Sequence, residues 1–464
     1  MERKNASTVV LVALAISALP LAFSSAMIYT ALATLQREFA DPAAVGWLIT
    51  GFLLVSTAFA ALGGRLGDLY GRSRMLLATL LLTGIGGLVS AVADDVRWVI
   101  AGRCLQGCSA AILPLCIGLV RENLERQRVP FGIGMVVTAN SVFAGLGAVL
   151  AGAIVQYASW PWVFFATAFA AGLGLVAVWR FVPRSLPIPG VRMDLGSGLL
   201  FVPAIAGLVF PLTHLNDWGW RDPRTLAWVV PSAALLAFWF RDQWRREHPL
   251  IDVRMLADRQ VALTNLLGAC IGMSIYQLAL FMMLLLQQPL WTGVGMGIGA
   301  ALAGLLKLPS NAMSMIGGPL SGWLAGRFGA RIAAVIGAAC GALGGLAMLL
   351  WHDSVVQIIG ASLVIGMSIA ITNTALPALL FEVVPADRTS ESNGVLVVIR
   401  GAFQAVGAQV VTALLAASHV LDAAGVPTIH PDRAAYLRTF AWVAAAMTVG
   451  TAVALALPRR PGAR

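Results

Sequence analysis

Residues 63–74 decide the fold of this chain: Gly63-Gly64-Arg65-Leu66-Gly67-Asp68-Leu69-Tyr70-Gly71-Arg72-Ser73-Arg74. The stretch separates two apolar segments, 45–62 and 75–93, each near the ~20 residues that a helix needs to cross a bilayer. Because the connection is short, we expect two antiparallel helices in contact, with the glycines allowing close backbone approach. Asp68 can accept charge-assisted hydrogen bonds from nearby arginines or from a helix N-terminus. On this composition alone, a basic loop with a helix-capping aspartate is an equally good interpretation.

The composition is that of an integral membrane protein. Of 464 residues, 59% are hydrophobic and 11% are charged, and the mean hydropathy is +0.84. Soluble domains carry about a quarter charged residues, and transmembrane β-strands give a shorter, alternating signal. We therefore expect an all-α polytopic membrane protein. The first apolar run, from Thr8, is longer than a secretory h-region, so we expect no cleavable signal.

By this length criterion we predict about fourteen membrane spans. They cover residues 8–35, 45–62, 75–93, 98–120, 131–157, 162–182, 195–213, 226–240, 261–286, 293–320, 332–351, 355–381, 394–417 and 436–457. If the N-terminus is inside, most of the 31 Lys and Arg residues fall in inward loops and tails. The positive-inside rule then predicts a multi-pass protein of the inner (plasma) membrane with both termini cytoplasmic. The net charge of +10 follows from this topology, and we expect no nucleic-acid partner.

A second copy of the opening stretch lies in the C-terminal half. In residues 322–331, Gly322, Leu324 and Gly329 match Gly64, Leu66 and Gly71, while Gly326 stands in the place of Asp68. Parallel repeats of this kind are a known plan for transporters. The separation of the two copies exceeds what six spans need, so we predict an inserted helix pair between the two halves.

The pattern Gly64-x-Leu66-x-Asp68-x-x-Gly71-Arg72-x-Arg74 resembles the loop-two signature of the major facilitator superfamily, a family of secondary transporters. The inserted pair resembles its fourteen-span branch, the drug:proton antiporters. The resemblance implies the major facilitator fold, with an N-terminal six-helix bundle at 1–182, an inserted pair and cytoplasmic linker at 183–260, and a C-terminal six-helix bundle at 261–464. It also implies that the opening stretch is a conformational latch, formed by Gly64, Asp68, Gly71, Arg72 and Arg74.

Polar side chains at membrane depth are costly and usually functional. Three pairs lie on single helix faces, at spacings of three or four residues: Arg103 with Gln106, Lys307 with Asn311, and Arg400 with Gln404. The first and third pairs resemble arginine-led motifs of the family, which implies substrate binding or coupling. Each has a structural alternative: an arginine that snorkels to the outer surface, a lysine satisfied by carbonyls, and an arginine at the cytoplasmic end of the bundle.

Lys307 is the sharpest of these candidates. It lies about 22 Å from Gly322 by helical rise, near the middle of predicted span 293–320, so its amine cannot easily reach the surface. Weaker candidates for substrate contact are Tyr29, Asn140, Asn265 and Tyr276, together with Asn373. Each of these is more readily explained by a hydrogen bond between helices.

The departures from the family pattern concern acids and a proline. None of the 21 Asp and Glu residues falls in the middle of a predicted span, and Ser24 stands where the branch carries an aspartate. The fifth-span antiporter motif has lost its proline at Gly147-Ala148, although Ala148 and Gly152 keep a small face for helix contact. A site with three cations and no acid should favour neutral or anionic compounds over cationic ones.

We therefore expect a secondary active transporter that exports small organic molecules by alternating access, in the manner of multidrug resistance proteins. Proton coupling is implied by the resemblance alone. An importer of organic acids, or a non-transporting receptor or scaffold with the same fold, stays open. An enzyme would need paired acids, a Ser/His pair or a His cluster at depth, so we predict no enzyme, cofactor or metal site. The expected partners are a small-molecule substrate, protons and the lipid bilayer, with the chain acting as a monomer.

Overall fold

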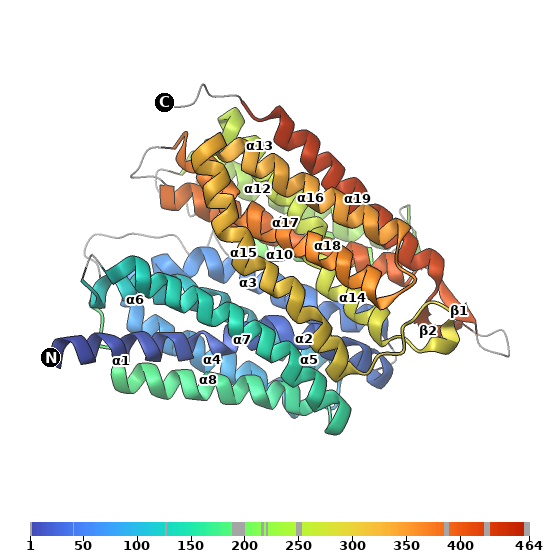
Figure 1. Cartoon of the computed structure of the whole chain (residues 1–464), viewed down its shortest axis with the longest axis horizontal. Helices are drawn as coiled ribbons and strands as arrows, with labels where there is room; N and C mark the ends of the chain where they lie inside the picture. The colour runs from blue at the N-terminus through green and yellow to red at the C-terminus, as the bar shows by residue number, and fades with distance from the viewer. Residues whose placement is uncertain are drawn as a thin grey trace. The chain divides into compact units, whose positions relative to one another are not determined.

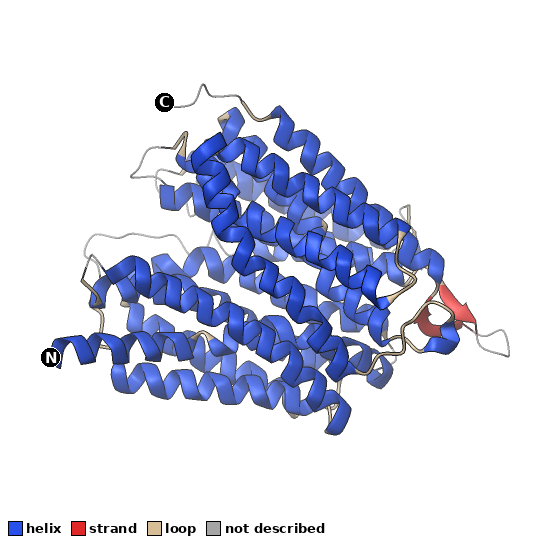
Figure 2. Cartoon of the chain, viewed as in Figure 1, coloured by secondary structure: helices blue, strands red, loops and turns tan. Residues whose placement is uncertain are grey.

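A computed structural model describes residues 2–39, 41–125, 128–187, 200–214, 218–219, 221–246, 253–384, 389–421 and 427–458. These residues are almost entirely helical, apart from one short antiparallel strand pair (Figure 2). The contacts divide the chain into two units. Unit 1 comprises Met1–Phe39, Trp47–Val202 and Gly299–Leu305, and unit 2 comprises Ala40–Gly46, Pro203–Ile298 and Leu306–Arg464.

The helices of the N-terminal part follow the predicted apolar segments (Figure 1). They are α1 (Glu2–Ser17), α2 (Leu19–Phe39), α3 (Pro42–Tyr70), α4 (Arg72–Ala91), α5 (Val96–Gly107), the 3-10 turn η1 (Cys108–Ala111), α6 (Ile112–Asn123), α7 (Val129–Tyr157) and α8 (Pro161–Phe181). In unit 1, α4 packs against α5 and α8, and α2 packs against α7. Leu14, Leu76 and Leu115 are among the side chains of the apolar core between these helices.

The remaining elements begin with two helices in the region where we predicted an inserted pair. They are α10 (Phe201–Thr213), α12 (Pro223–Arg245), η3 (Val253–Ala257), α13 (Arg259–Met273), η4 (Ile275–Gln277), α14 (Leu278–Gln287), η5 (Leu290–Thr292), α15 (Ala300–Phe328), α16 (Ala330–Leu350), α17 (Val355–Phe381), α18 (Thr389–Leu415), β1 (His419–Leu421), β2 (Pro427–Pro431) and α19 (Arg433–Ala456). In unit 2, α16 packs against α17 and α19, and α13 packs against α18. Much of the predicted linker, at 188–199 and 247–252, lies outside the described residues.

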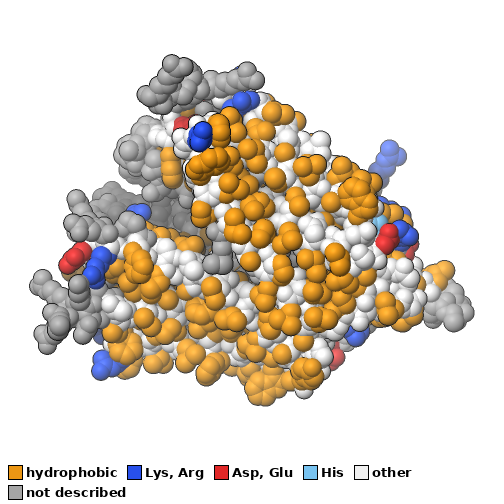
Figure 3. Space-filling model, viewed as in Figure 1, with side chains coloured by type: hydrophobic (Ala, Val, Ile, Leu, Met, Phe, Trp, Pro, Cys, Tyr) orange, Lys and Arg blue, Asp and Glu red, His pale blue; other side chains and the backbone are white. Residues whose placement is uncertain are grey.

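The chain is a multi-pass membrane protein by helix length and composition. In the part of the chain that is described, eleven helices qualify as spans, or twelve if the bent pair Ala44–Ala60 and Leu62–Tyr70 counts as one. The prediction of about fourteen is therefore not confirmed: Phe201–Leu212 is a shorter apolar helix, and α15, which carries Lys307 and two prolines, is not among the eleven. On the face seen in Figure 3, hydrophobic side chains cover most of the helix surface.

The predicted turn at 63–74 is shorter than we expected. Helix α3 continues to Tyr70 and α4 begins at Arg72, so Gly71 alone separates them, at φ 91°. Gly329 separates α15 from α16 in the same way, at φ 90°, which supports the internal repeat. Both glycines occupy the left-handed half of φ, where a side chain is disfavoured.

Two glycines of this stretch allow close helix contact with a further span. A Cβ on Gly63 would lie 2.5 Å from Ala111 Cβ, and one on Gly67 would lie 2.5 Å from Leu115 Cδ2, so α3 packs closely against η1 and α6 of the fourth predicted span. A Cβ on Gly64 would meet open space. The close approach therefore includes the fourth span, and a Cβ on Gly67 would also lie 3.5 Å from Arg72 Cα at the start of α4, whereas Gly64 does not contribute.

The small face of α7 also makes backbone contact, here within unit 1. A Cβ on Gly152 would lie 2.6 Å from Ala301 Cα, and one on Gly304 would lie 2.5 Å from the Ala148 carbonyl oxygen. Gln156 Oε1 accepts a hydrogen bond from the Ala301 N–H at 3.2 Å, at the start of α15. The loss of the motif's proline has therefore left a tightly packed helix contact in place.

Candidate functional site

Arg103 lies inside unit 1 and is 1% exposed. Its Nε donates to the Leu48 carbonyl at 3.0 Å, and its Nη1 donates to the Ser24 carbonyl at 2.9 Å. The guanidinium also lies 4.3 Å from the centre of the Phe52 ring. Arg103 therefore joins α5 to α2 and α3. The snorkelling alternative is wrong, because the charge is held between helices and not at the surface.

Gln106 lies one turn along α5 and belongs to the same cluster. Its Oε1 accepts a hydrogen bond from Arg103 Nη1 at 2.6 Å. Arg103 Nη2, Gln106 Nε2 and the Ser24 hydroxyl are all buried, and none has a hydrogen-bond partner among the described residues. Buried polar atoms are normally satisfied by protein or ordered water. Tyr29 on α2 interacts electrostatically with Arg103, so this predicted residue belongs to the cluster too.

Arg400 belongs to a second polar cluster, in unit 2. Its Nη1 donates to Asn373 Oδ1 at 2.6 Å, and the Tyr276 hydroxyl donates to the same oxygen, also at 2.6 Å. The guanidinium carbon lies 5.6 Å from the centre of the Tyr276 ring. The structure thus brings together Arg400 and two of the weaker candidates, Tyr276 and Asn373.

The ninth predicted span is broken, and the break positions Tyr276. Helix α13 ends at Met273, and the 3-10 turn η4 precedes α14. Gln277 Nε2 donates to the Gly272 carbonyl at 3.0 Å and to the Gln404 carbonyl at 3.0 Å. Discontinuous helices of this kind form binding sites in many transporters. In this contact Gln404 takes part through its backbone carbonyl and not through its side chain.

The remaining predicted residues are more scattered. Lys307 and Asn311 are half-buried on α15. Helix α15 begins at Ala300 rather than near Gly293, so Lys307 lies about 10 Å from the start of its helix. Asn265 is buried and donates to the Val261 carbonyl at 2.8 Å within its own helix. Asn140 is half-buried on α7, and its Oδ1 has no partner among the described residues.

The predicted latch is a network of charges at the end of α3. Arg72 Nη2 contacts Asp68 Oδ1 at 2.7 Å, and Arg72 Nη1 donates to the Gly118 carbonyl at 3.1 Å. Arg72 Nη1 also lies 3.2 Å from Glu122 Oε1 on α6. A Cβ on Gly118 would lie 2.6 Å from Arg72 Cδ, so the absence of a side chain at this position leaves room for the arginine.

Glu122 and Ser185 belong to the same network, although the sequence did not indicate them. Ser185 Oγ donates to Glu122 Oε2 at 2.6 Å, and the Ser185 N–H donates to Ser73 Oγ at 2.8 Å. Arg74 is exposed and takes no part in the hydrogen bonds that the structure describes around Asp68. Glu122 is a single acid at the basic end of a span, and no motif in the neighbouring sequence predicts its partner. Its pairing with Arg72 depends on how α6 packs beside the end of α3.

The acids that the structure describes lie at helix ends or in connections. Asp68 is two residues from the end of α3, and Asp242 is three residues from the end of α12. Asp222, Asp258 and Asp432 are N-caps of α12, α13 and α19. The two polar clusters at membrane depth therefore contain arginine, amide and hydroxyl groups, and no acid among the described residues contacts either.

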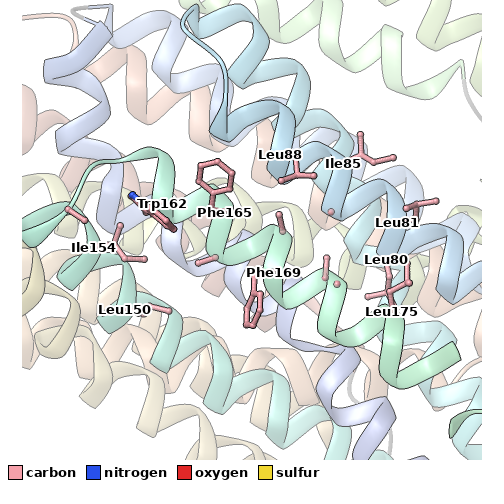
Figure 4. Close-up of a pocket in the computed structure, with 16 residues that line it drawn as sticks. Leu80, Leu81, Ile85, Leu88, Leu150, Ile154, Trp162, Phe165, Phe169 and Leu175 are labelled. Atoms are coloured by element: carbon pink, nitrogen blue, oxygen red, sulfur yellow. The ribbon is translucent and has the colours of Figure 1, made fainter. Parts of the chain in front are cut away.

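One apolar groove lies on the outside of unit 1, between α4, α7 and α8, with a volume of about 970 Å³ (Figure 4). Figure 4 shows Phe165 and Phe169 of α8 on one side and Ile85 and Leu88 of α4 on the other. Its lining is aliphatic and aromatic. Such a surface suits lipid acyl chains, so we place no polar substrate group there.

Helices that cross the membrane many times and hold cations inside their spans have the architecture of a membrane transporter. The family model described as Major Facilitator Superfamily matches residues 14–408, and the chain belongs to this superfamily of non-enzymatic transporters. The chain is 29% identical over 285 residues to the lincomycin resistance protein of Streptomyces lincolnensis, covering 60% of this chain and 59% of that protein. It is 26% identical over 402 residues to the multidrug resistance protein Stp of Mycobacterium tuberculosis (strain CDC 1551 / Oshkosh), covering 84% and 72%.

Solved structures confirm the fold. The nucleoside transporter NupG superposes with a TM-score of 0.68 at 12% identity, covering 97% of this chain and 100% of that one. A peptide transporter POT in complex with sulfate superposes with a TM-score of 0.66 at 14% identity, covering 97% and 93%. At these identities the likeness concerns the fold alone.

Proposed function

We propose that this chain exports small organic molecules by alternating access and belongs to the fourteen-span drug-efflux branch of the superfamily. The relatives named for lincomycin resistance and multidrug resistance support an exporter. The helices α10 and α12, between two six-helix bundles at 1–182 and 261–464, are consistent with the inserted pair of that branch.

The observation that carries the substrate preference is the charge of the polar clusters. Arg103 and Arg400 are held at membrane depth by neutral oxygens, and Lys307 adds a third cation. A field of this sign disfavours cationic compounds and favours neutral or anionic ones. We therefore propose that Arg103, Gln106, Lys307, Asn311, Arg400, Gln404, Tyr29, Asn140, Asn265 and Tyr276 include the residues that bind substrate or couple its movement.

The membrane potential can drive transport in the direction that we propose. With both termini cytoplasmic in a bacterial-type inner membrane, an anion leaving a negative-inside cell gains about 2.3 kcal/mol per charge per 100 mV. Acid export can therefore run on the membrane potential. Proton coupling rests on the family relationship, since no acid of the described spans lies near either cluster.

The Asp68–Arg72–Glu122 network is proposed as the conformational latch. It joins the end of α3 to α6, and through Ser185 it also holds the segment that follows α8. Breaking such a network changes the relative stability of conformations rather than the binding groups. Latch variants should thus alter transport rate more than substrate affinity.

The test is the flux of labelled organic acids from proteoliposomes that contain the wild type, Lys307→Ala or Arg400→Ala. We expect acid flux in the wild type that falls in both variants. Unchanged anion flux in both variants would remove the charge argument. Uptake against the expected direction would support an organic-acid importer, and the absence of flux for acids, neutral compounds and cations would support a receptor or scaffold.

A further inference from the structure

In the cluster of Tyr276, Asn373 and Arg400, the hydrogen-bond donors and the acceptor can be assigned. A guanidinium carries donors and no acceptor, so the oxygen of the Asn373 amide must face Arg400. That oxygen accepts from Arg400 Nη1 and from the Tyr276 hydroxyl, at 2.6 Å each. Both of its acceptor positions are thereby used, and the Nδ2 donors point away from the two partners.

The cluster lies inside the membrane span and is open on one side. Asn373 is about 12 Å from the end of α17 and Arg400 about 16 Å from the start of α18 by helical rise. Asn373 is nevertheless exposed, and Arg400 and Tyr276 are half-buried. Exposed polar groups at this depth line polar cavities rather than lipid.

The frame around the cluster is rigid. A Cβ on Gly272 would lie 2.5 Å from the Arg400 carbonyl oxygen, and one on Gly407 would lie 2.6 Å from Met273 Cα. Helices α13 and α18 therefore touch through their backbones at the arginine itself and about two turns beyond it. Trp442 Nε1 donates to the Met273 carbonyl at 3.2 Å and satisfies the break in the ninth span. Side chains mounted on such a frame lose little entropy on binding, which is the basis of preorganised recognition.

The groups left unused are donors with one positive charge. They are the Arg400 N–H groups other than the one on Nη1 that meets Asn373, together with Asn373 Nδ2. The partners of Arg400 in the described residues are neutral, so its charge has no carboxylate beside it. Planar donors in this arrangement match the two oxygens of a carboxylate.

We propose that Tyr276, Asn373 and Arg400 form the subsite for the carboxylate of an organic-acid substrate, an inference that rests on the proposed transport function. Arg400 supplies the charge and one or more hydrogen bonds. Asn373 is the specificity residue, because it aligns the guanidinium through Oδ1 and offers Nδ2 to the ligand. Tyr276 is a positioning residue that holds Asn373 through its hydroxyl.

The decisive variant is Asn373→Asp. An aspartate keeps both hydrogen bonds of the cluster, but it supplies an internal counter-ion to Arg400 and removes the Nδ2 donors. Gln357→Glu is the matched control, since it makes the same amide-to-acid change near the outer end of α17, where the Gln357 oxygen accepts from the Asp353 and Ser354 N–H groups. Tyr276→Phe removes the hydroxyl and keeps the ring.

Thermal stabilisation of the purified full chain by matched acids and amides gives the readout, with benzoate and benzamide, and indole-3-acetate and indole-3-acetamide, as the probes. We expect the wild type and Gln357→Glu to bind at least one acid more tightly than its amide. Asn373→Asp and Arg400→Ala should weaken acid binding by about tenfold or more and leave amide binding within about twofold. Tyr276→Phe should weaken acid binding by a smaller factor.

Two results would contradict the subsite. In the first, the wild type binds none of the acids more tightly than the matching amide. In the second, Asn373→Asp prefers acids to amides as strongly as the wild type does. Flux from proteoliposomes separates this failure from that of transport itself. If the wild type moves these compounds while Asn373→Asp keeps the acid preference, the subsite is wrong and the exporter proposal stands.

Discussion

The hydroxyl of Ser185 donates to the carboxylate of Glu122 at 2.6 Å, while the other oxygen of that carboxylate lies 3.2 Å from Arg72. One acid thus connects the turn after α3, the end of α6 and the segment after α8. The groups are partly exposed, with 22% of the Arg72 side chain and 33% of the Glu122 side chain accessible. Exposed ion pairs contribute little stability, so the latch that we propose would act by favouring one conformation over another.

Glu122→Gln should slow transport with little loss of stability. The amide keeps a hydrogen-bond acceptor for Ser185 but loses the charge that faces Arg72. We expect the flux of a transported compound to fall about tenfold while the free energy of unfolding changes by less than about 1 kcal/mol. Arg121→Gln, a change at the exposed neighbour, is the control. Equal flux in both variants would show that the network is not a latch.

Gly71→Ala should destabilise the protein. Its φ of 91° is unfavourable for alanine, and a Cβ there would lie 2.5 Å from the Ser185 carbonyl oxygen. We expect a loss of about 1–2 kcal/mol, or more if Ser185 cannot move. Gly64→Ala, whose Cβ meets open space, should be tolerated. Thermal unfolding in one detergent compares the two, and equal melting temperatures would be inconsistent with this turn.

Arg103→Lys should lose stability although it keeps the charge. A lysine cannot reproduce the planar fork that contacts the carbonyls of Leu48 and Ser24 together. Removing charged hydrogen bonds from a buried position costs about 2–3 kcal/mol. The measurement is denaturant unfolding of the purified variant. A lysine variant as stable as the wild type would mean that Arg103 is not a clamp between helices.

Asp432 should give the N-terminal end of α19 an acid-sensitive stability. Burial raises the pKa of Asp432, but hydrogen bonds from Ser418 and the Ala435 N–H, with Arg438 nearby, outweigh this and hold the pKa below its usual 3.8. A lowered pKa stabilises the folded state above the unfolded value, and this contribution is lost as the pH falls through the folded pKa. Asp432→Asn should therefore flatten the fall in melting temperature between about pH 5 and pH 2. Asp353→Asn, an acid-to-amide change at an exposed ion pair with Arg433, is the comparison variant.

The sequence predicted the fold better than the site. Apolar length and the repeated glycines gave the helices and the turns at Gly71 and Gly329, because these depend on local composition and backbone conformation. The sequence did not predict where α15 starts. Hydropathy indicates a span from residue 293, but Gly293 and Gly297 have positive φ and follow the 3-10 turn η5. Lys307 therefore lies about 10 Å from the start of its helix, closer than a span that starts at residue 293 would place it.

The pairings inside the site could not be predicted in the same way. Asn373 and Arg400 are 27 residues apart, and Glu122 and Ser185 are 63 residues apart, so helix packing alone brings them together. No proline marks the break at Tyr276, so the sequence does not predict that this span is interrupted. Helical periodicity places residues on a face, but it does not say which face of another helix they will meet.

The most direct measurement of the central claim compares matched acid, amide and amine compounds in the same proteoliposomes at a fixed membrane potential. We expect the acid to be exported at an initial rate that rises as the interior becomes more negative, and the amine to move slowest. Lys307→Ala and Arg400→Ala should reduce this preference for the acid. Transport of the amine as fast as the acid, with both variants unchanged, would contradict a cationic, acid-free substrate site.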